Sequence, residues 1–361
     1  MRKYLSLFSR ISFLLFTLSA LIYAASLASQ DIADLVNGTV SVGVRFILSS
    51  LTYIFPFSVF EMLIIISPAI LVFSVVFIVK FRKNAVERIR TLISILALIA
   101  LIFTAYIYTL GVGYRTTLLS ERTGIEDARD IEPSELYVTV ERVIGEMNKL
   151  SDEVPFKGGE TVMPYSIDEM NRKLIDAYDS MNSRYSILTN FTSGVKPVYF
   201  STVMSDLGIS GIYSFFTGEA NVNIEYPDYC LPFTAAHELA HQRGISRENE
   251  ANFVAFLVCI SSDDEYIRYS GYLNIYEYLA SALYRQDKEL YYEAVSTLPA
   301  AAIADIRAAG EVYDKHKDSI LGKINDKLND AYLKANGTEG VVSYGYVVRL
   351  AVGYYRNENN Q

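Results

Sequence analysis

The sequence predicts a mainly helical membrane protein, in which three transmembrane helices precede a mostly helical domain with a small β-sheet edge. Charge and hydropathy divide the chain in this way. Residues 1–113 contain long apolar runs with nine Lys/Arg and four Asp/Glu, whereas residues 114–361 contain 23 and 37. In the second part most apolar residues recur at helical spacing, and one short segment alternates as a strand does.

The first part contains three runs that are long enough to cross a bilayer, which takes about 20 apolar residues. We expect these spans at about 11–30, 60–79 and 91–113, which makes residues 1–113 a membrane domain. Residues 24–26 (Ala-Ala-Ser) leave open that the first run is a cleaved signal peptide, although its length is nearer that of a span. The apolar segment 35–53 is interrupted by Gly38 and Gly43, and we expect it to lie along or dip into the outer interface.

The loops between these runs set the expected orientation. Basic residues gather before the first run and in the 80–90 loop, whereas Arg45 is the only basic residue in the loop after the first run. The positive-inside rule then places the N-terminus and the 80–90 loop in the cytoplasm, and residues 114–361 outside it. The expected location is a cell membrane that the chain crosses several times, with the lipid bilayer as a partner. Ser58 and Glu61 form a capping box that begins the second span.

The overall composition excludes several classes of protein. A formal charge of −9 argues against a nucleic-acid partner bound through a basic face. Two cysteines exclude a disulfide scaffold and a multi-cysteine metal domain. Cys230 and Cys259 are expected to be buried free thiols.

The strongest local signal is the pair His237 and His241. Four residues apart on a helix that is expected from about Phe233, they lie on one face about 5–6 Å apart. Each imidazole can place a nitrogen on one zinc ion. Glu238 is turned about 100° around the helix, which suits a general base better than a ligand. This is the HExxH arrangement of zinc hydrolases.

A zinc site of this kind needs a third protein ligand and an open fourth position. Gly244 is expected to end the first helix and Ser246 to cap the next one. Two acids on that second helix compete as the ligand. We favour Glu248, near the positive end of the helix dipole, over Glu250, which points about 200° away. Asn252, one turn after Glu248, is expected to hydrogen-bond a ligand imidazole.

In this chain HELAH is followed by Glu-x-Glu-Ala-Asn, and this pattern resembles the gluzincin metallopeptidases, whose second signature is a Glu followed at the next turn by Ala and Asp or Asn. The longer strings at 216–223 and 231–244 resemble a family of uncharacterised bacterial multi-pass membrane proteins grouped in that clan. The resemblance covers nearly the whole chain and implies a zincin-like domain that binds Zn²⁺. It implies His237, His241 and Glu248 as ligands and Glu238 as base. Asn252 departs from the Asp common in better-studied gluzincins.

The segment Glu219–Glu225 alternates apolar and polar residues and is expected to be a half-buried strand. The resemblance suggests that this strand forms the rim of the substrate cleft. A free strand edge can bind an extended peptide through its backbone. We therefore expect Asn221, Val222 and Asn223 to contact the substrate.

Two further groups of residues carry weaker expectations. His316 lies in a charged helical segment and is expected to have a surface role. One of several tyrosines could donate a hydrogen bond to the oxyanion of a reaction. The candidates are Tyr269, Tyr272, Tyr344 and Tyr346.

Together these observations predict a membrane-anchored, zinc-dependent metallopeptidase that acts on a peptide or protein substrate. The alternative is a non-catalytic membrane protein that keeps zinc for structure or sensing, and a closed four-ligand site would distinguish it. A transporter is weakly supported, because the spans lack intramembrane charges and broken helix pairs.

Overall fold

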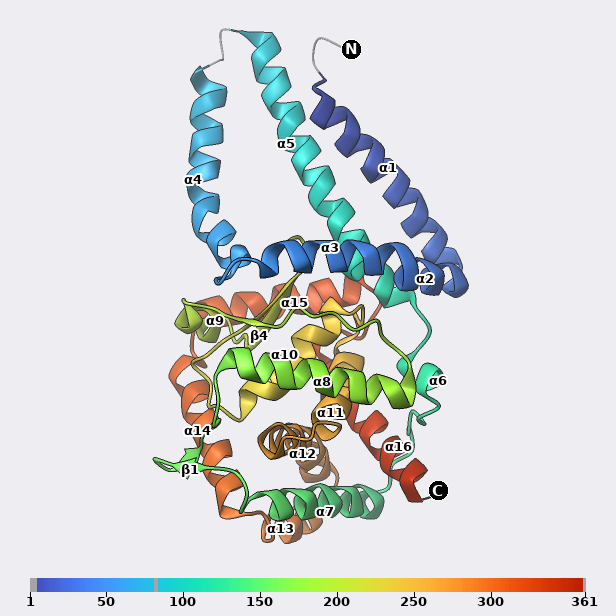
Figure 1. Cartoon of the computed structure of the whole chain (residues 1–361), viewed down its shortest axis with the longest axis vertical. Coiled ribbons are helices and arrows are strands. Elements are labelled where there is room, and N and C mark those ends of the chain that lie inside the picture. The colour runs from blue at the N-terminus through green and yellow to red at the C-terminus, as the bar shows by residue number, and fades with distance from the viewer. Residues whose placement is uncertain (1–4, 81–83, 360–361) are drawn as a thin grey trace. The chain divides into compact units, whose positions relative to one another are not determined.

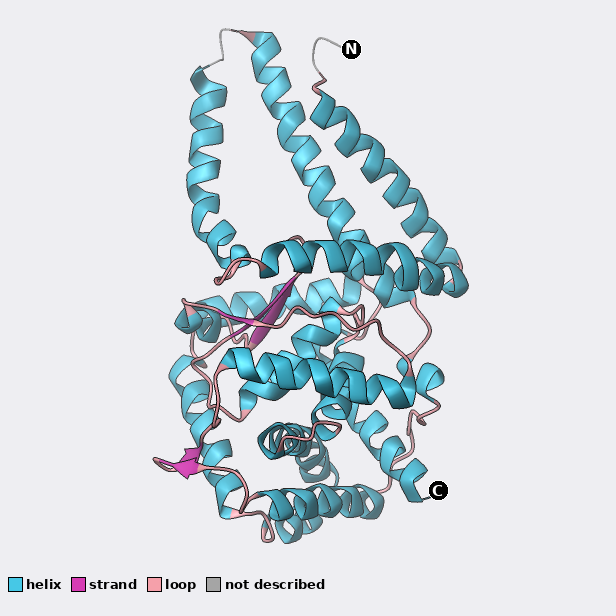
Figure 2. Cartoon of the chain, viewed as in Figure 1, coloured by secondary structure: helices cyan, strands magenta, loops and turns pink. Residues whose placement is uncertain are grey.

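The computed structural model describes residues 5–80 and 84–359 and divides into two compact units (Figure 1). The first unit comprises the chain up to Thr116 together with the loop Ser214–Glu219, and the second comprises the rest. Helices predominate in both units and the strands are short (Figure 2). The prediction of a mainly helical chain with a small sheet is confirmed.

The first unit is built from long apolar helices. Among the described residues, four segments are long and apolar enough to cross a membrane, one more than the sequence patterns predicted; the additional one is Gln30–Tyr53. The elements of this unit are α1 (Leu7–Ala28), α2 (Gln30–Val36), the π-helix η1 (Asn37–Ser41), α3 (Val42–Tyr53), α4 (Val59–Lys80), α5 (Ala85–Tyr106), the π-helix η2 (Ile107–Gly111) and the 3-10 helix η3 (Val112–Arg115).

The segment formed by α2, η1 and α3 packs against α1 and η2, and it runs across the ends of α1 and α5 rather than alongside them (Figure 1). This is the arrangement expected of a segment that lies along an interface. Arg45 on α3 is buried here and donates to the side chain of Asn37 at 2.8 Å and to the carbonyl of Tyr108 at 3.2 Å. Both acceptors lie in π-helical turns, where the helical hydrogen-bond register changes.

The N-terminus of α4 is capped by two separate parts of the chain. Ser58 Oγ accepts from the backbone N–H of Glu61 at 3.0 Å, as the capping box predicts. The buried carboxylate of Glu219 accepts from the N–H groups of Val59 and Phe60 at 3.0 and 2.7 Å. A carboxylate is stabilised at a helix N-terminus by the free N–H groups and the helix dipole. The loop Ser214–Glu219 is thereby fixed within the first unit.

The second unit carries the remaining helices and two small sheets. Its elements are α6 (Leu119–Thr123), α7 (Pro133–Leu150), β1 (Phe156–Lys157), β2 (Glu160–Thr161), α8 (Ile167–Tyr185), β3 (Lys196–Pro197), α9 (Ser201–Asp206), β4 (Gly211–Ser214), β5 (Glu219–Val222), α10 (Cys230–Gln242), α11 (Glu248–Ile260), α12 (Glu265–Gln286), α13 (Lys288–Val295), α14 (Ala300–His316), α15 (Ile320–Ala335), the 3-10 helix η4 (Gly340–Tyr346) and α16 (Val347–Asn359).

Its larger sheet has the strand order β3-β5-β4, so β5 is the central strand. β3 pairs with β5 in parallel, with Lys196 opposite Asn221. On the other side, the N–H of Asn223 donates to the carbonyl of Ser210, just before β4, at 2.8 Å. The expectation from the resemblance that this strand has a free edge is therefore wrong, and its residues are fully buried rather than half-buried.

The core of this unit surrounds α11, which is buried from Glu250 to Cys259. A helix that is buried on all sides must be apolar all round, and α11 is so except near its N-terminus. α12 approaches it closely at Gly271, where a Cβ atom would lie 2.4 Å from the Cβ of Cys259. Cys230 and Cys259 are both free, as predicted, and Cys230 is only partly buried.

Candidate metal centre

Helix α10 carries the two histidines and begins at Cys230, three residues before the predicted start. Pro232 lies in its first turn, where a missing N–H breaks no helical hydrogen bond. The helix ends at Gln242 with Arg243 as its C-cap, and the next residue, Gly244, has a φ of 106°, a conformation that favours glycine. This confirms the predicted role of Gly244.

The turn between the two helices is short and well ordered by hydrogen bonds. The N–H of Ile245 returns to the carbonyl of Ala240 at 3.0 Å. The N-cap of α11 is Arg247 and not the predicted Ser246. The hairpin brings the first residue of α11, Glu248, back to the histidine face of α10.

Three side-chain atoms from this hairpin converge. His237 Nε2 and His241 Nε2 are 3.0 Å apart, and Glu248 Oε2 lies 3.3 and 3.4 Å from them. The three side chains are between 8% and 13% exposed, so they are shielded without being closed off. Within residues 5–80 and 84–359, this is the one group of three or more His, Cys, Asp or Glu with metal-ligand geometry.

The spacing of these atoms fits a metal ion. Ligand atoms that lie about 2.0–2.1 Å from a tetrahedral zinc are about 3.3 Å from one another. The Nδ1 atom of His241 is 2.7 Å from the carbonyl of Ile245. Since a carbonyl only accepts, Nδ1 carries a proton, which leaves Nε2 as the nitrogen that can bind a metal once its own proton is displaced.

The charges in the cluster support one another. Burial acts to lower the pKa of His241, but the carboxylate of Glu248 outweighs it and raises the pKa to about 9. Burial acts to raise the pKa of Glu248, but His241 and His237 hold it well below its usual range. Glu248 is therefore ionised, which is the form that binds a metal.

Glu238, the predicted general base, is buried and does not share the ligand cluster. Burial raises the pKa of its carboxyl, and the imidazoles of His237 and His241 oppose that rise. The backbone N–H of Tyr213 on β4 donates to this carboxylate. The Tyr213 ring also stacks on His241, with ring centroids 6.5 Å apart.

Strand β4 approaches Glu238 so closely that only glycine fits. A Cβ atom on Gly211 would lie 2.6 Å from Glu238 Oε1, 2.7 Å from its Cγ and 2.7 Å from Thr234 Cγ2. Sequence patterns gave no sign of this role for Gly211 or Tyr213, because neither lies near the HExxH motif in the chain.

The structure separates the two acids of α11. Glu250 Oε1 accepts from the N–H of Leu119 at 2.9 Å and from Arg247 at 3.2 Å, so its carboxylate is used away from the histidines. This agrees with the choice of Glu248 over Glu250. Asn252 is buried, but it bonds to neither imidazole. His241 Nδ1 faces the carbonyl of Ile245, and His237 Nδ1 has no hydrogen-bond partner among the described residues. The predicted hydrogen bond from Asn252 is therefore wrong.

Of the four tyrosines considered, only Tyr344 is placed near the cluster. Burial and the carboxylates of Glu248 and Glu238 raise the pKa of its phenol. The hydroxyl of Tyr269 donates to Asp305 instead, and that of Tyr346 to Glu339. Tyr272 packs against Phe256.

The residues predicted to bind substrate do not form an open strand edge. Asn221, Val222 and Asn223 are at most 1% exposed, because β3 and β4 flank β5 on both sides. The side chain of Asn223 donates to Ser205 Oγ at 2.9 Å and holds the turn that follows the strand. The outer strands of this sheet are β3 and β4, and β4 is the one that contacts Glu238.

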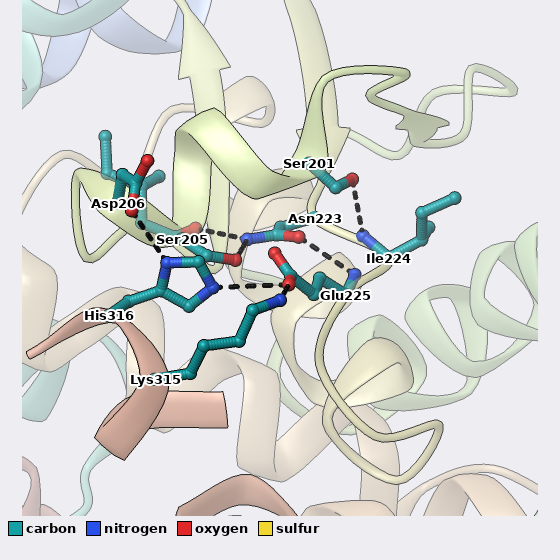
Figure 3. Close-up of polar contacts among 9 residues, drawn as sticks. Ser201, Ser205, Asp206, Asn223, Ile224, Glu225, Lys315 and His316 are labelled. Atoms are coloured by element: carbon teal, nitrogen blue, oxygen red, sulfur yellow. Dashed lines mark hydrogen bonds and ion pairs between the residues drawn. The ribbon is translucent and has the colours of Figure 1, made fainter. Parts of the chain in front are cut away.

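His316 does not lie on the surface as predicted. Its side chain is 7% exposed and lies between two carboxylates (Figure 3). Nδ1 is 2.7 Å from Asp206 Oδ1, and Nε2 is 3.2 Å from Glu225 Oε1. Lys315 also binds Glu225. The charged neighbours that suggested a solvated helix face instead form an ion-pair cluster.

Comparison with known proteins assigns the chain to a family. Residues 39–352 match the family described as "Protein of unknown function (DUF3810)", so the chain belongs to it. Neither the curated proteins nor the solved structures contain a significant match.

Proposed function

We propose that this chain is a membrane-anchored, zinc-dependent metallopeptidase of the gluzincin type. The observation that carries the proposal is the convergence of His237, His241 and Glu248 beside the buried carboxylate of Glu238. Three protein ligands leave a position open for water and substrate, as in catalytic zinc sites, whereas structural sites use four.

The residues of the chain have distinct roles in this proposal. His237, His241 and Glu248 hold the metal. Zinc, when bound, supplies a Lewis acid that activates water and polarises a carbonyl at neutral pH. Glu238 accepts the proton of the attacking water and later delivers it to the leaving amine. Tyr213 orients Glu238 through its backbone N–H.

Tyr344 is our candidate for the group that stabilises the developing oxyanion. Its phenol lies close enough to Glu248 and Glu238 for their charges to raise its pKa, and so it stays protonated and able to donate.

We further propose that the apolar helices of the first unit lie in a cell membrane. Basic residues gather in the 80–90 loop, which supports a cytoplasmic location for this loop and for the N-terminus. The second unit, from Thr117 onward, is then extracytoplasmic, and its substrates are peptides or proteins reached from that side.

The test is cleavage of a mixed peptide library by the purified full-length chain, followed by mass spectrometry. We expect cleavage that a chelator abolishes and added Zn²⁺ restores, and that Glu238→Gln eliminates. Glu277→Gln is the matched control. Glu277 does not belong to the ligand cluster, and its carboxyl accepts from the hydroxyl of Tyr229 at 3.0 Å, a hydrogen bond that an amide oxygen can also accept, so the amide should be tolerated.

Zinc binding without cleavage of any peptide would favour the alternative, a non-catalytic zinc-binding protein. Equal cleavage by Glu238→Gln and wild type would exclude Glu238 as the base.

A further inference from the structure

Helix α15 (Ile320–Ala335) exposes a continuous apolar stripe. Ile320, Leu321, Ile324 and Leu328 are 74%, 47%, 51% and 64% exposed. Spacings of four residues place Ile320, Ile324 and Leu328 on one face, with Leu321 beside them. Large apolar side chains that gather on a surface in this way mark an interaction site.

The opposite face of α15 packs within the second unit. Asn325 Nδ2 donates to the carbonyl of Leu207, after α9, at 3.0 Å. At Gly322 the helices are so close that a Cβ atom would lie 3.1 Å from the carbonyl oxygen of Asp206. Asn329, on the same packed side, contacts the hydroxyl of Tyr344 at 3.5 Å. One side of α15 therefore packs against the second unit, and the apolar stripe is on the other side.

Helix α9 (Ser201–Asp206), against which α15 packs, also exposes apolar side chains. Val203 is 47% exposed, and just before the helix Tyr199 and Phe200 are 85% and 49% exposed. We call these three residues and the α15 stripe the α9–α15 apolar surface.

The ion-pair cluster of Figure 3 fixes the two helices that carry this surface. His316 ends α14, and its backbone carbonyl accepts from the N–H of Ser319, the N-cap of α15, at 2.9 Å. The same histidine bonds to Asp206, the last residue of α9, at 2.7 Å and to Glu225 at 3.2 Å. α9 and the start of α15 are thus bonded to the same histidine, which fixes the two helices that carry the apolar surface relative to each other.

The chain itself indicates what covers this surface. Within the part of the chain that the structure describes, four helices are long and apolar enough to cross a membrane, so a lipid bilayer is an apolar phase that the second unit can reach. Lys323 and Lys327 precede Ile324 and Leu328 by one residue each and lie along one side of the stripe. An apolar face flanked by lysines, with aromatic residues beside it, is the pattern of helices that lie in the membrane interface.

We infer that the α9–α15 apolar surface lies on the lipid bilayer, with the α15 stripe in the boundary between headgroups and acyl chains. The second unit is then held on the membrane by its own surface, in addition to its covalent link to the apolar helices. This inference does not depend on the metal centre.

A fluorescent probe at single introduced cysteines tests this inference in the full-length chain. Ile324→Cys and Leu328→Cys report on the stripe. Val138→Cys on α7 is the control, because the exposed fraction of Val138, 48%, is similar to the 51% of Ile324, and Val138 is not part of the α9–α15 apolar surface. All variants carry Cys230→Ser, because Cys230 is only partly buried, whereas the fully buried Cys259 should not react.

The labelled proteins are reconstituted in phosphatidylcholine–phosphatidylglycerol vesicles. We expect spin-labelled lipid to quench most of the fluorescence at positions 324 and 328 and little at 138. Aqueous iodide should quench in the opposite order. Iodide quenching at all three positions would overturn the inference. Protection of 324 and 328 from both quenchers would also overturn it, because a protein, such as a second copy, would then cover the stripe.

Discussion

Substitution of Gly211 by alanine should reduce peptidase activity without removing the metal. The added Cβ atom would lie 2.6 Å from Glu238 Oε1, whereas ordinary van der Waals contact begins at 3.4 Å. Glu238 would have to retreat by roughly 0.8 Å, and a misplacement of about 1 Å in a catalytic group can cost about 10²-fold in rate. We therefore expect kcat/KM to fall by about two orders of magnitude.

The effect on stability should be smaller. Overpacking typically costs about 1–3 kcal/mol, and here the Cβ atom meets a side-chain carboxylate and the methyl group of Thr234 rather than backbone. We expect a cost at the lower end of that range. Zinc content should be unchanged, because none of the nearest atoms belongs to His237, His241 or Glu248.

The assay is peptide cleavage with parallel measurements of zinc content and thermal unfolding. Gly310→Ala is the matched control, since an added Cβ atom there meets nothing within 4 Å and alanine is the better helix former by up to about 1 kcal/mol. Full activity in Gly211→Ala would refute the placement of Glu238 by β4. Loss of zinc in this variant would show that Glu238 or its neighbours hold the metal.

Three other predictions concern separate parts of the chain. Tyr344→Phe should lower kcat by about 10²-fold with little change in zinc content, as expected for loss of one oxyanion donor. Tyr346→Phe is the control and should leave kcat unchanged, because the hydroxyl of Tyr346 bonds to the exposed Glu339. Equal activities of the two variants would exclude Tyr344 as the donor. Hydrogen bonding to Asp206 and Glu225 raises the pKa of His316 above its usual 6.5, so its stabilisation is complete below pH 6.5 and is lost as the pH rises through the raised value. The difference in melting temperature between wild type and His316→Gln should accordingly be larger at pH 6 than at alkaline pH, and a constant difference would contradict this. A topology reporter fused after Gln361 should report an extracytoplasmic C-terminus if Gln30–Tyr53 lies along the interface, whereas a cytoplasmic signal would mean that this segment spans the membrane.

Much of the candidate site could be predicted from the sequence because it is local. His237 and His241 share a helical face by spacing alone, and Gly244 makes the turn that returns Glu248 to them. Glu248 and Glu250 were distinguished by their angle around the same helix. In each case the distance along the chain fixes the distance in space.

The features that sequence patterns missed depend on contacts between distant segments. Alternation identified the strand Glu219–Val222, but a strand's own sequence does not say whether neighbours pair on both sides, and β5 proved to be central. Gly211 lies against Glu238 although it precedes it by 27 residues and belongs to no motif. The charged run around His316 indicated solvent exposure, because its partners Asp206 and Glu225 lie far away in the sequence.

The zinc content of the purified full-length chain tests the central claim most directly. We predict one zinc per chain in the wild type, retained in Glu238→Gln and in Glu250→Gln, and lost in Glu248→Gln. Glu250→Gln is the matched control, because it lies two residues away on the same helix and its carboxylate binds Leu119 and Arg247 rather than the histidines. A wild-type chain that binds no zinc, or a Glu248→Gln variant that keeps its full content, would contradict the account.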